Sequence, residues 1–197
     1  MRSCVMKIVV VLSLSCLALP ATGQVTLVTG RAALGGTDGV DWGALGPVGT
    51  MLSSSFAVTS SGGVPLGVSK GAPIGFRRVD QFVQWAGNFA PGDRLIRNLA
   101  PAGRMFIDFP EPVFGGGVQV QRAMYGSFTA TIEAFDVNGV SLGSFSEPGF
   151  SDNGGDNSAM FIGVKSSTAD ISRIALDVDP GSGLAYGINQ FDLVLPP

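Results

Sequence analysis

Hydrophobic and polar residues alternate with a period of two along much of this chain. In residues 128–134, Phe, Ala, Ile and Ala occupy one set of alternate positions, and Thr, Thr and Glu occupy the other. Residues 174–178 and 191–195 repeat the alternation. Because successive side chains of a strand point to opposite faces of a sheet, this pattern predicts strands with one buried face.

Turn-forming residues separate these segments at short intervals. Further strands are expected at 105–109, 160–164, 171–178 and 186–195, and a hairpin at 56–58 and 64–68 across Ser61-Gly62-Gly63. Residues 86–93 and 147–158 have the composition of loops. Only residues 78–85, with Val79, Phe82 and Val83 at helical spacing, predict a short helix. The predicted fold class is therefore all-β, an antiparallel, jelly-roll-like β-sandwich.

Two hairpins are expected in the central part of the chain. Asn138-Gly139 is a strong signal for a two-residue turn, which would place Val137 opposite Val140 and Ile132 opposite Phe145. The same turn would pair Phe135 with Leu142. Upstream, a loop at Tyr125-Gly126-Ser127 would pair residues 117–121 with 128–134, placing Gln121 opposite Thr131.

The first 23 residues have the features of an export signal. Arg2 and Lys7 precede an apolar stretch at 8–18, and Ala21-Thr22-Gly23 predicts cleavage after Gly23. Met6 is an alternative start. Cys16 would be the acylated residue of a lipoprotein signal, although Ser13 stands where leucine is expected. We therefore expect one domain at 24–197, secreted to the periplasm or the extracellular space, without a membrane span.

Composition removes several classes of function. The sequence has no histidine, and both of its cysteines lie in the predicted signal, so disulfides and histidine- or thiol-based catalysis are not expected in the mature chain. Removal of the signal leaves 10 basic against 15 acidic residues, a net charge of −5. This balance disfavours nucleic acid as a partner. A Gly-rich segment at 35–39 lacks the lysine of a phosphate-binding loop.

Six short segments resemble a group of exported bacterial β-sandwich proteins that often carry a PEP-CTERM sorting tail. The segments are Asp41-Trp42-Gly43, Trp85 with residues 87–93, and residues 117–120, 128–132, 161–164 and 186–189. The downstream half of that group is similar to the galactose-binding-like jelly roll. The resemblance implies fold and export, and it implies no activity. The sequence ends at Leu195-Pro196-Pro197 without such a tail, so anchoring by that route is not expected.

Tryptophans and amides are the clearest candidate ligand-binding groups. Sugars stack their CH-rich faces on exposed aromatic rings and bond to amides and carboxylates. The residues proposed for such a site are Trp42, Trp85, Asn88, Gln119, Gln121, Thr131 and Glu133, the last four forming one polar strip across two strands. The alternative is that both tryptophans belong to the core and the strip faces water.

Carboxylates offer two further hypotheses. Asp108, Glu111 and Glu133 could supply a hydrolytic pair, although scattered acidic residues form such pairs by chance. The oxygen-rich segment 151–157 could bind calcium through Asp152 and Asp156, but Gly154 stands where an EF-hand loop has Asp or Asn. No other cofactor is expected.

Three functions remain open. The first is a non-catalytic extracellular binding module, with a glycan or the extracellular matrix as partner. The second is a structural or cell-surface protein without a small-molecule site, and the third is a hydrolase that uses only carboxylates. Exposure of Trp42 or Trp85 would favour the first and burial of both the second, whereas a carboxylate pair in a deep cleft would favour the third.

Overall fold

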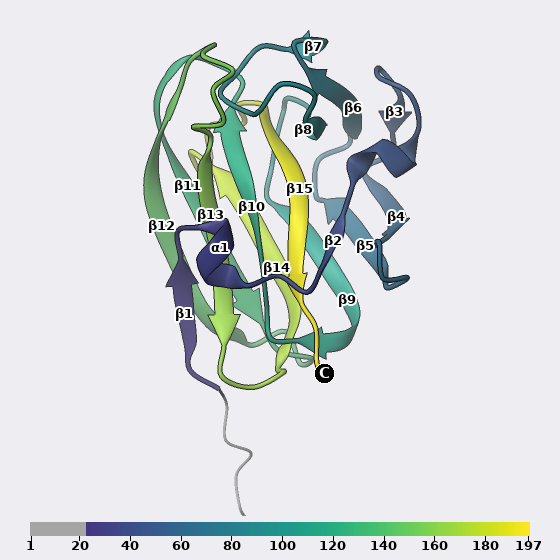
Figure 1. The fold of residues 1–197 in the computed structure, drawn as a ribbon, viewed down its shortest axis with the longest axis vertical. Helices are drawn as coiled ribbons and strands as arrows, with labels where there is room; N and C mark the ends of the chain where they lie inside the picture. The colour runs from purple at the N-terminus through teal and green to yellow at the C-terminus, as the bar shows by residue number, and fades with distance from the viewer. Residues whose placement is uncertain (1–22) are drawn as a thin grey trace, which may run out of the picture.

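The structure is a computed structural model that describes residues 23–197 and has two β-sheets packed face to face (Figure 1). All of the predicted signal at 1–23 except Gly23 lies outside the described residues. Sheet A has the order β1-β13-β10-β15-β8-β6-β3, with β2 paired to β15 and β7 paired to β6. Its strands are β1 (Val25–Val28), β2 (Asp38–Val40), β3 (Met51–Leu52), β6 (Phe76–Gln81), β7 (Gln84–Trp85), β8 (Arg94–Asn98), β10 (Gly115–Arg122), β13 (Met160–Ser166) and β15 (Tyr186–Val194).

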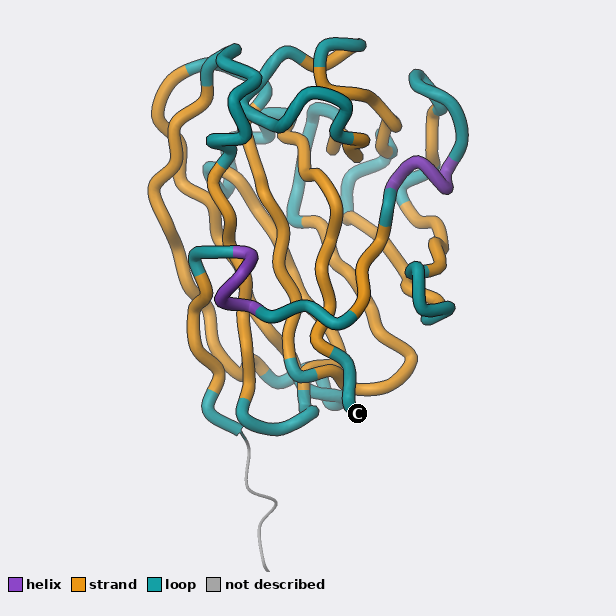
Figure 2. Tube along the Cα trace, viewed as in Figure 1, coloured by secondary structure: helices purple, strands orange, loops and turns teal. Residues whose placement is uncertain are grey.

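Sheet B has the order β12-β11-β14-β9-β5-β4. Its strands are β4 (Ser55–Thr59), β5 (Pro65–Lys70), β9 (Met105–Val113), β11 (Gly126–Phe135), β12 (Ser141–Ser151) and β14 (Ile171–Val178). Every strand pair in the two sheets is antiparallel except β6 with β7. The predicted antiparallel β-sandwich is confirmed, and strands form most of the tube in Figure 2.

The alternating segments supply the two inner faces of the sandwich. Ile132 and Ile174 from sheet B and Val118 and Ile188 from sheet A belong to one fully buried cluster. All the predicted strands are present, and β4 pairs with β5 as the predicted hairpin. The core therefore follows from the period-two pattern, since one face of each strand is apolar.

The hairpin between β11 and β12 has a different turn from the one expected. Ile132 does lie opposite Phe145, but Phe135 pairs with Ser141 after an irregularity in the register. Gly139 N donates to Asp136 O and Asp136 N donates to Val140 O, which makes a three-residue loop. Within this loop of residues 137–139, only Gly139 has a positive φ, of +76°. This is a type I turn followed by a glycine bulge, so the two-residue turn is wrong.

The predicted pairing of residues 117–121 with 128–134 is also wrong. Both edges of β10 are occupied within sheet A, by β13 and by β15. The connection after Arg122 therefore crosses to sheet B, where β11 pairs with β12 and β14. Strand periodicity fixes which face of a strand is buried, but it does not select the neighbouring strand.

Residues 78–85 do not form a helix. β6 ends at Gln81, and a tight turn with Phe82 at φ +68° and Gln84 at φ +70° leads directly into β7. The apparent helical spacing arises because Val79 packs on the sheet while the turn directs Phe82 to solvent. The helices lie elsewhere, at α1 (Arg31–Leu34) and the 3-10 helix η1 (Trp42–Leu45).

Loops and a short helix cover much of the outer face of sheet A. Loops at 86–93 and 152–159 lie over the outer face of sheet A, where Asn88 and Asp152 bond to Gln121 of β10. Beneath them, Val79, Trp85, Phe89, Leu95 and Ala159 form a second apolar cluster. α1 adds a third cluster through Leu34, with Val28, Phe161 and Val194. Among residues 23–197, no helix is long and apolar enough to cross a membrane.

Candidate functional site

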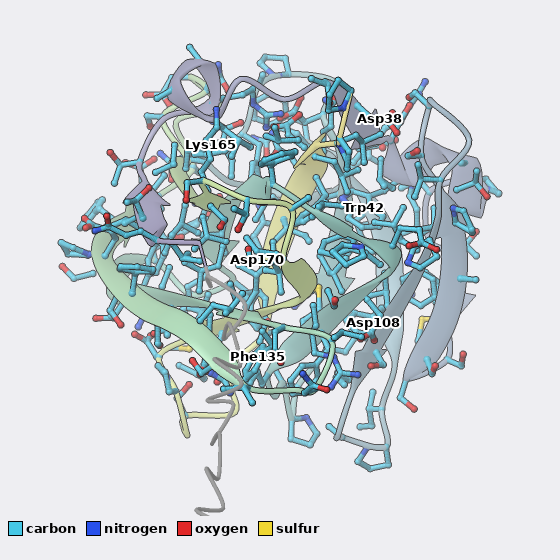
Figure 3. All side chains as sticks on the ribbon, turned by 90° about the horizontal axis from the view of Figure 1, so that it is seen from below. Asp38, Trp42, Asp108, Phe135, Lys165 and Asp170 are labelled. Atoms are coloured by element: carbon cyan, nitrogen blue, oxygen red, sulfur yellow. The ribbon has the colours of Figure 1, made fainter. Side chains whose placement is uncertain are left out.

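Both tryptophans are buried, so the predicted stacking surface does not exist. Trp42 is 1% exposed and Trp85 is 6% exposed. Trp42 lies inside the molecule (Figure 3), where its Nε1 donates to Asn189 O at 2.7 Å. Trp85 packs between Phe89 and the guanidinium of Arg97. The expectation that one of them is exposed is wrong, because loops cover the outer face of sheet A and 3-10 helix η1 packs into the core.

Four of the proposed site residues do meet, in a buried hydrogen-bond network that we call the amide network. It consists of Trp85, Asn88, Gln121 and Asp152. Gln121 Oε1 accepts from Asn88 N at 2.9 Å and from Trp85 Nε1 at 3.3 Å, and Gln121 Nε2 donates to Asn88 Oδ1 at 2.6 Å. Asn88 Oδ1 also accepts from Asp152 N at 2.8 Å. Asn88 and Gln121 are 3% and 1% exposed, so the network fastens the two covering loops to β10.

The polar strip predicted across two strands is not formed. Gln119 and Gln121 lie on the outer face of sheet A, whereas Thr131 and Glu133 lie on the outer face of sheet B. Thr131 Oγ1 shares a hydrogen bond with Ser146, and Glu133 forms an ion pair with Arg104. The strip is absent for the same reason that residues 117–121 do not pair with 128–134: β10 belongs to sheet A and β11 to sheet B.

Gln119 instead lines an open depression on sheet A, which we call the polar groove. Two adjoining hollows of about 290 and 180 Å3 share Asp93 and Gln190 in their walls. The groove is lined by Arg31, Asp41, Ala90, Gly92, Asp93, Arg94, Gln119, Asn157, Asn189 and Gln190. These residues come from six separate segments, so only the folded chain brings them together.

A β-bulge in β15 directs two amides to the groove. Val118 pairs with Phe191 and Val120 pairs with Ile188, so Gln119 faces two residues, Asn189 and Gln190. A bulge inserts one extra residue and re-aims the side chains beside it. Gln190 is consequently exposed at the rim, while Asn189 is buried beneath it.

Asn189 organises the floor of the groove. Its Nδ2 donates to Asp93 Oδ2 at 3.0 Å and to Gln119 Oε1 at 2.6 Å. Its Oδ1 accepts from Arg31 Nη2 at 3.0 Å and from Gln119 N at 3.1 Å. The Asn189 amide is therefore saturated. The exposed amides of Asn157 and Gln190 make fewer contacts: Asn157 Oδ1 accepts from Gln119 Nε2 at 3.1 Å, and Gln190 Nε2 donates to Asp192 Oδ1 at 2.8 Å.

The charges of the groove are balanced. Arg94 pairs with Asp41, and Arg31 pairs with Asp192 just behind the groove. Burial raises the pKa of Asp192, while the Arg31 guanidinium acts in the opposite direction. Since the lining holds two arginines and two aspartates, the groove suits a neutral ligand rich in donors and acceptors rather than a strongly charged one.

The proposed calcium ligands are engaged within their own loop. Asp152 Oδ1 accepts from Asn88 Nδ2 and from Gly154 N, and hydrogen bonds from Ser158 lower the pKa of Asp156. In residues 23–197, no three acidic, histidine or cysteine side chains gather in a way that could hold a metal ion. Calcium binding by Asp152 and Asp156 stays a prediction.

Two of the candidate catalytic carboxylates line a different cleft, at the end of sheet B. This cleft of about 480 Å3 is lined by residues 108–112, 135–139, Ser172 and Arg173, and so includes Asp108 and Glu111. Asp108 and Phe135, which both line this cleft, are labelled in Figure 3. Glu133 does not line it. Asp108 accepts a hydrogen bond from Arg173 Nε. One carboxylate of the proposed hydrolytic pair is therefore already engaged in an ion pair with Arg173.

Sequence reasoning missed most of the groove. Of its polar residues only Gln119 was proposed, and Arg31, Asp93, Asn157, Asn189 and Gln190 were not. One signal was present in the sequence. Ile188 and Phe191 are both buried but stand three positions apart, which breaks the period of two and marks a bulge at Asn189-Gln190.

Comparisons with known proteins identify no family. No family model and no curated protein matches the sequence. Similar solved structures include a DUF4465 family protein from Bacteroides caccae, at 11% identity over 82% of this chain and 98% of that chain, with a TM-score of 0.30. They also include CsCBM6-3 from Clostridium stercorarium in complex with cellobiose, at 10% identity over 90% and 100%, with a TM-score of 0.25.

A third similar structure is the CBM22-1 xylan-binding domain of Paenibacillus barcinonensis Xyn10C, at 14% identity over 77% of this chain and 99% of that chain, with a TM-score of 0.23. At these TM-scores the similarity carries no argument about a site. None of these three proteins is named as a PEP-CTERM protein, so that resemblance stays a prediction.

Proposed function

We propose that this chain is an exported, non-catalytic module that binds a neutral glycan in the polar groove. The observation that carries the proposal is the bulge in β15, which directs Asn189 and Gln190 to an opening where amides, carboxylates and guanidinium groups from six segments meet. A glycan offers neutral hydroxyl groups that both donate and accept, which matches this lining. Export rests on the signal features at 1–23.

Burial of both tryptophans favours a competing function, a structural or cell-surface protein without a small-molecule site. That alternative explains the buried rings and the amide network, but it gives no role to a charge-balanced groove with exposed amides. The cleft that contains Asp108 and Glu111 favours the third function, a hydrolase, but Asp108 is already paired with Arg173. The groove is the feature that the binding function alone explains.

The experiment is a glycan-array screen of residues 24–197, followed by calorimetry on the glycans that bind. Gln190→Ala and Asn157→Gly remove exposed groove amides, and each is expected to weaken binding by about tenfold, the equivalent of one hydrogen-bonding contact. Asn157 has φ +64°, so glycine keeps its backbone conformation.

Asn138→Ala is the matched control, since it removes an exposed amide from the turn at the end of sheet B. Binding that is equal in all three variants would contradict the groove as the site. A folded protein that binds no glycan on the array would overturn the proposed function in favour of the structural alternative.

A further inference from the structure

Three aromatic side chains among residues 23–197 are strongly exposed: Phe82 at 57%, Tyr125 at 54% and Phe150 at 60%. Two of them adjoin the loops that border the polar groove. Tyr125 Oη donates to Ala86 O at 3.3 Å, and the Phe82 ring lies against Gly155. Phe150 instead lies opposite Ser127 on the outer face of sheet B. The chain thus has exposed rings beside the groove, although not the tryptophans.

The backbone at Phe82 is strained, although its ring is exposed. Phe82 and Gln84 have φ of +68° and +70°, a region that bulky L-residues rarely adopt. The turn is held by hydrogen bonds from Phe82 N to Trp85 O at 2.7 Å and from Asp80 N to Val83 O at 3.0 Å. Burial of the ring does not account for this strain, because most of the ring faces solvent. Such strain persists where the surroundings enforce it and is concentrated at ligand sites.

One loop connects the ring to the groove. Gly155 contacts Phe82, while Asn157, two residues further along, lines the groove. Two residues span at most about 7 Å of extended chain. The loop is fixed by Gly155 N to Gly87 O at 2.8 Å and by Ala159 N to Asn88 O at 3.1 Å. A Cβ at Gly155 would come within 2.1 Å of Phe82 Cζ, so glycine permits the close approach of the ring.

We infer that Phe82 and Tyr125 extend the polar groove into a longer site, and that the ligand is an oligosaccharide segment of several units rather than a single sugar. This inference rests on the proposed function. One sugar unit would satisfy the amides of the groove, and further units would cross the loop at 155–157 and stack on the exposed rings. Stacking on a ring adds apolar contact that hydrogen bonds alone do not supply.

The test is calorimetry with ladders of one to six units of β-1,4-glucan, β-1,4-xylan and any glycan found on the array. For the wild-type protein we expect affinity to rise by about tenfold or more between one and four units. Phe82→Gly and Tyr125→Ala should each remove most of that rise while leaving the affinity for the single unit unchanged. Phe150→Ala, the matched control, should keep the whole rise.

Phe82→Gly also separates a binding role from a structural one. Glycine relieves the positive φ, so the variant should melt at the same temperature as the wild type or higher while losing the dependence on ligand length. A clear fall in melting temperature would show that the ring stabilises the fold, and would overturn the inference. So would equal affinity for one and four units, or ring variants that bind as the wild type does.

These outcomes are distinct from failure of the proposed function. Length-independent binding that still responds to Gln190→Ala leaves the groove as a glycan site and removes only the extension. Absence of binding to every ladder and to the array removes both.

Discussion

The outer faces of sheets A and B begin from the same sequence pattern and end in opposite environments. On sheet A, Gln119 and Gln121 alternate with buried valines, and Gln121 is 1% exposed beneath two loops. On sheet B, Thr131 and Glu133 alternate with buried residues in the same way, yet Thr131 is exposed to solvent beside Ser146. Glu133, with 15% of its side chain exposed, pairs with the more exposed Arg104. Alternation shows which residues leave the core, but it does not show whether they reach water.

The difference has an energetic consequence. A buried amide that loses its partner leaves several donors and acceptors unsatisfied, and each costs about 1–3 kcal/mol. An exposed polar group such as the Thr131 hydroxyl exchanges its partner for water at little cost. The same polar substitution should therefore be severe on sheet A and mild on sheet B.

The sharpest way to test this comparison is a matched pair of variants, Gln121→Leu and Thr131→Val. Gln121→Leu leaves Asn88 N and Trp85 Nε1 without their partner and removes one of the two donors to Asn88 Oδ1, so we expect a loss of about 3 kcal/mol or more in the free energy of unfolding. Thr131→Val should change it by about 0.5 kcal/mol or less. Urea denaturation of both variants measures the two values, and equal losses would contradict the comparison.

A second prediction probes the interior between the two faces. Lys70, on β5, is 6% exposed and donates to Asn98 Oδ1 at 2.6 Å and to Leu99 O at 2.8 Å, without a carboxylate among its hydrogen-bond partners. Burial lowers its pKa from 10.5 to about 8. Between pH 8 and 10.5 the folded state releases a proton that the unfolded state retains, so stability should rise with pH across this window.

Lys70→Gln should remove that rise while keeping a donor near Asn98. Unfolding curves at several pH values between 7 and 11 provide the measurement. Wild-type stability that stays flat or falls relative to Lys70→Gln from pH 8 to 10.5 would show that the buried ammonium is not penalised.

The smallest expected effect lies at the turn between β11 and β12, at the open end of sheet B. Gly139 has φ +76° and no atom within 4 Å of a Cβ placed there, so space does not restrict it. Gly139→Val should still lose about 1 kcal/mol or more, because a β-branched side chain is forced to positive φ. Asn138→Ala, which precedes it at ordinary φ, is the control. A melting temperature equal to that of the wild type for Gly139→Val would contradict the turn assignment.

Much of the fold was predictable because it depends on local pattern. The apolar faces of β11, β14 and β15 follow from alternation, and the pairing of Ile132 with Phe145 follows from a glycine-containing turn near its expected place. The β4–β5 hairpin follows from Ser61-Gly62-Gly63 in the same way. These features need only the two-residue period of a strand and the backbone freedom of glycine.

The candidate site was predictable only in part. Trp85, Asn88, Gln121 and Asp152 do gather, but in a buried network, because the loops that carry Asn88 and Asp152 fold over Gln121 of β10. Phe82 was assigned to a helix, since a strand that ends in a strained turn produces the same three- and four-residue spacing. Gln119 was proposed, whereas its partners in the groove were not.

The sequence by itself determined that apolar and polar residues alternate, that each strand buries one face and that the strands form a β-sandwich. The reason is that every second side chain of a strand points to the same face, where burial of apolar groups is favourable. Only the tertiary structure decided which strands share a sheet and which polar residues are covered. That choice depends on contacts between distant segments, such as Gln119 with Asn189 and Asn88 with Asp152, which no local pattern specifies. The tertiary structure therefore moved the candidate site from the tryptophans to a groove built by a bulge.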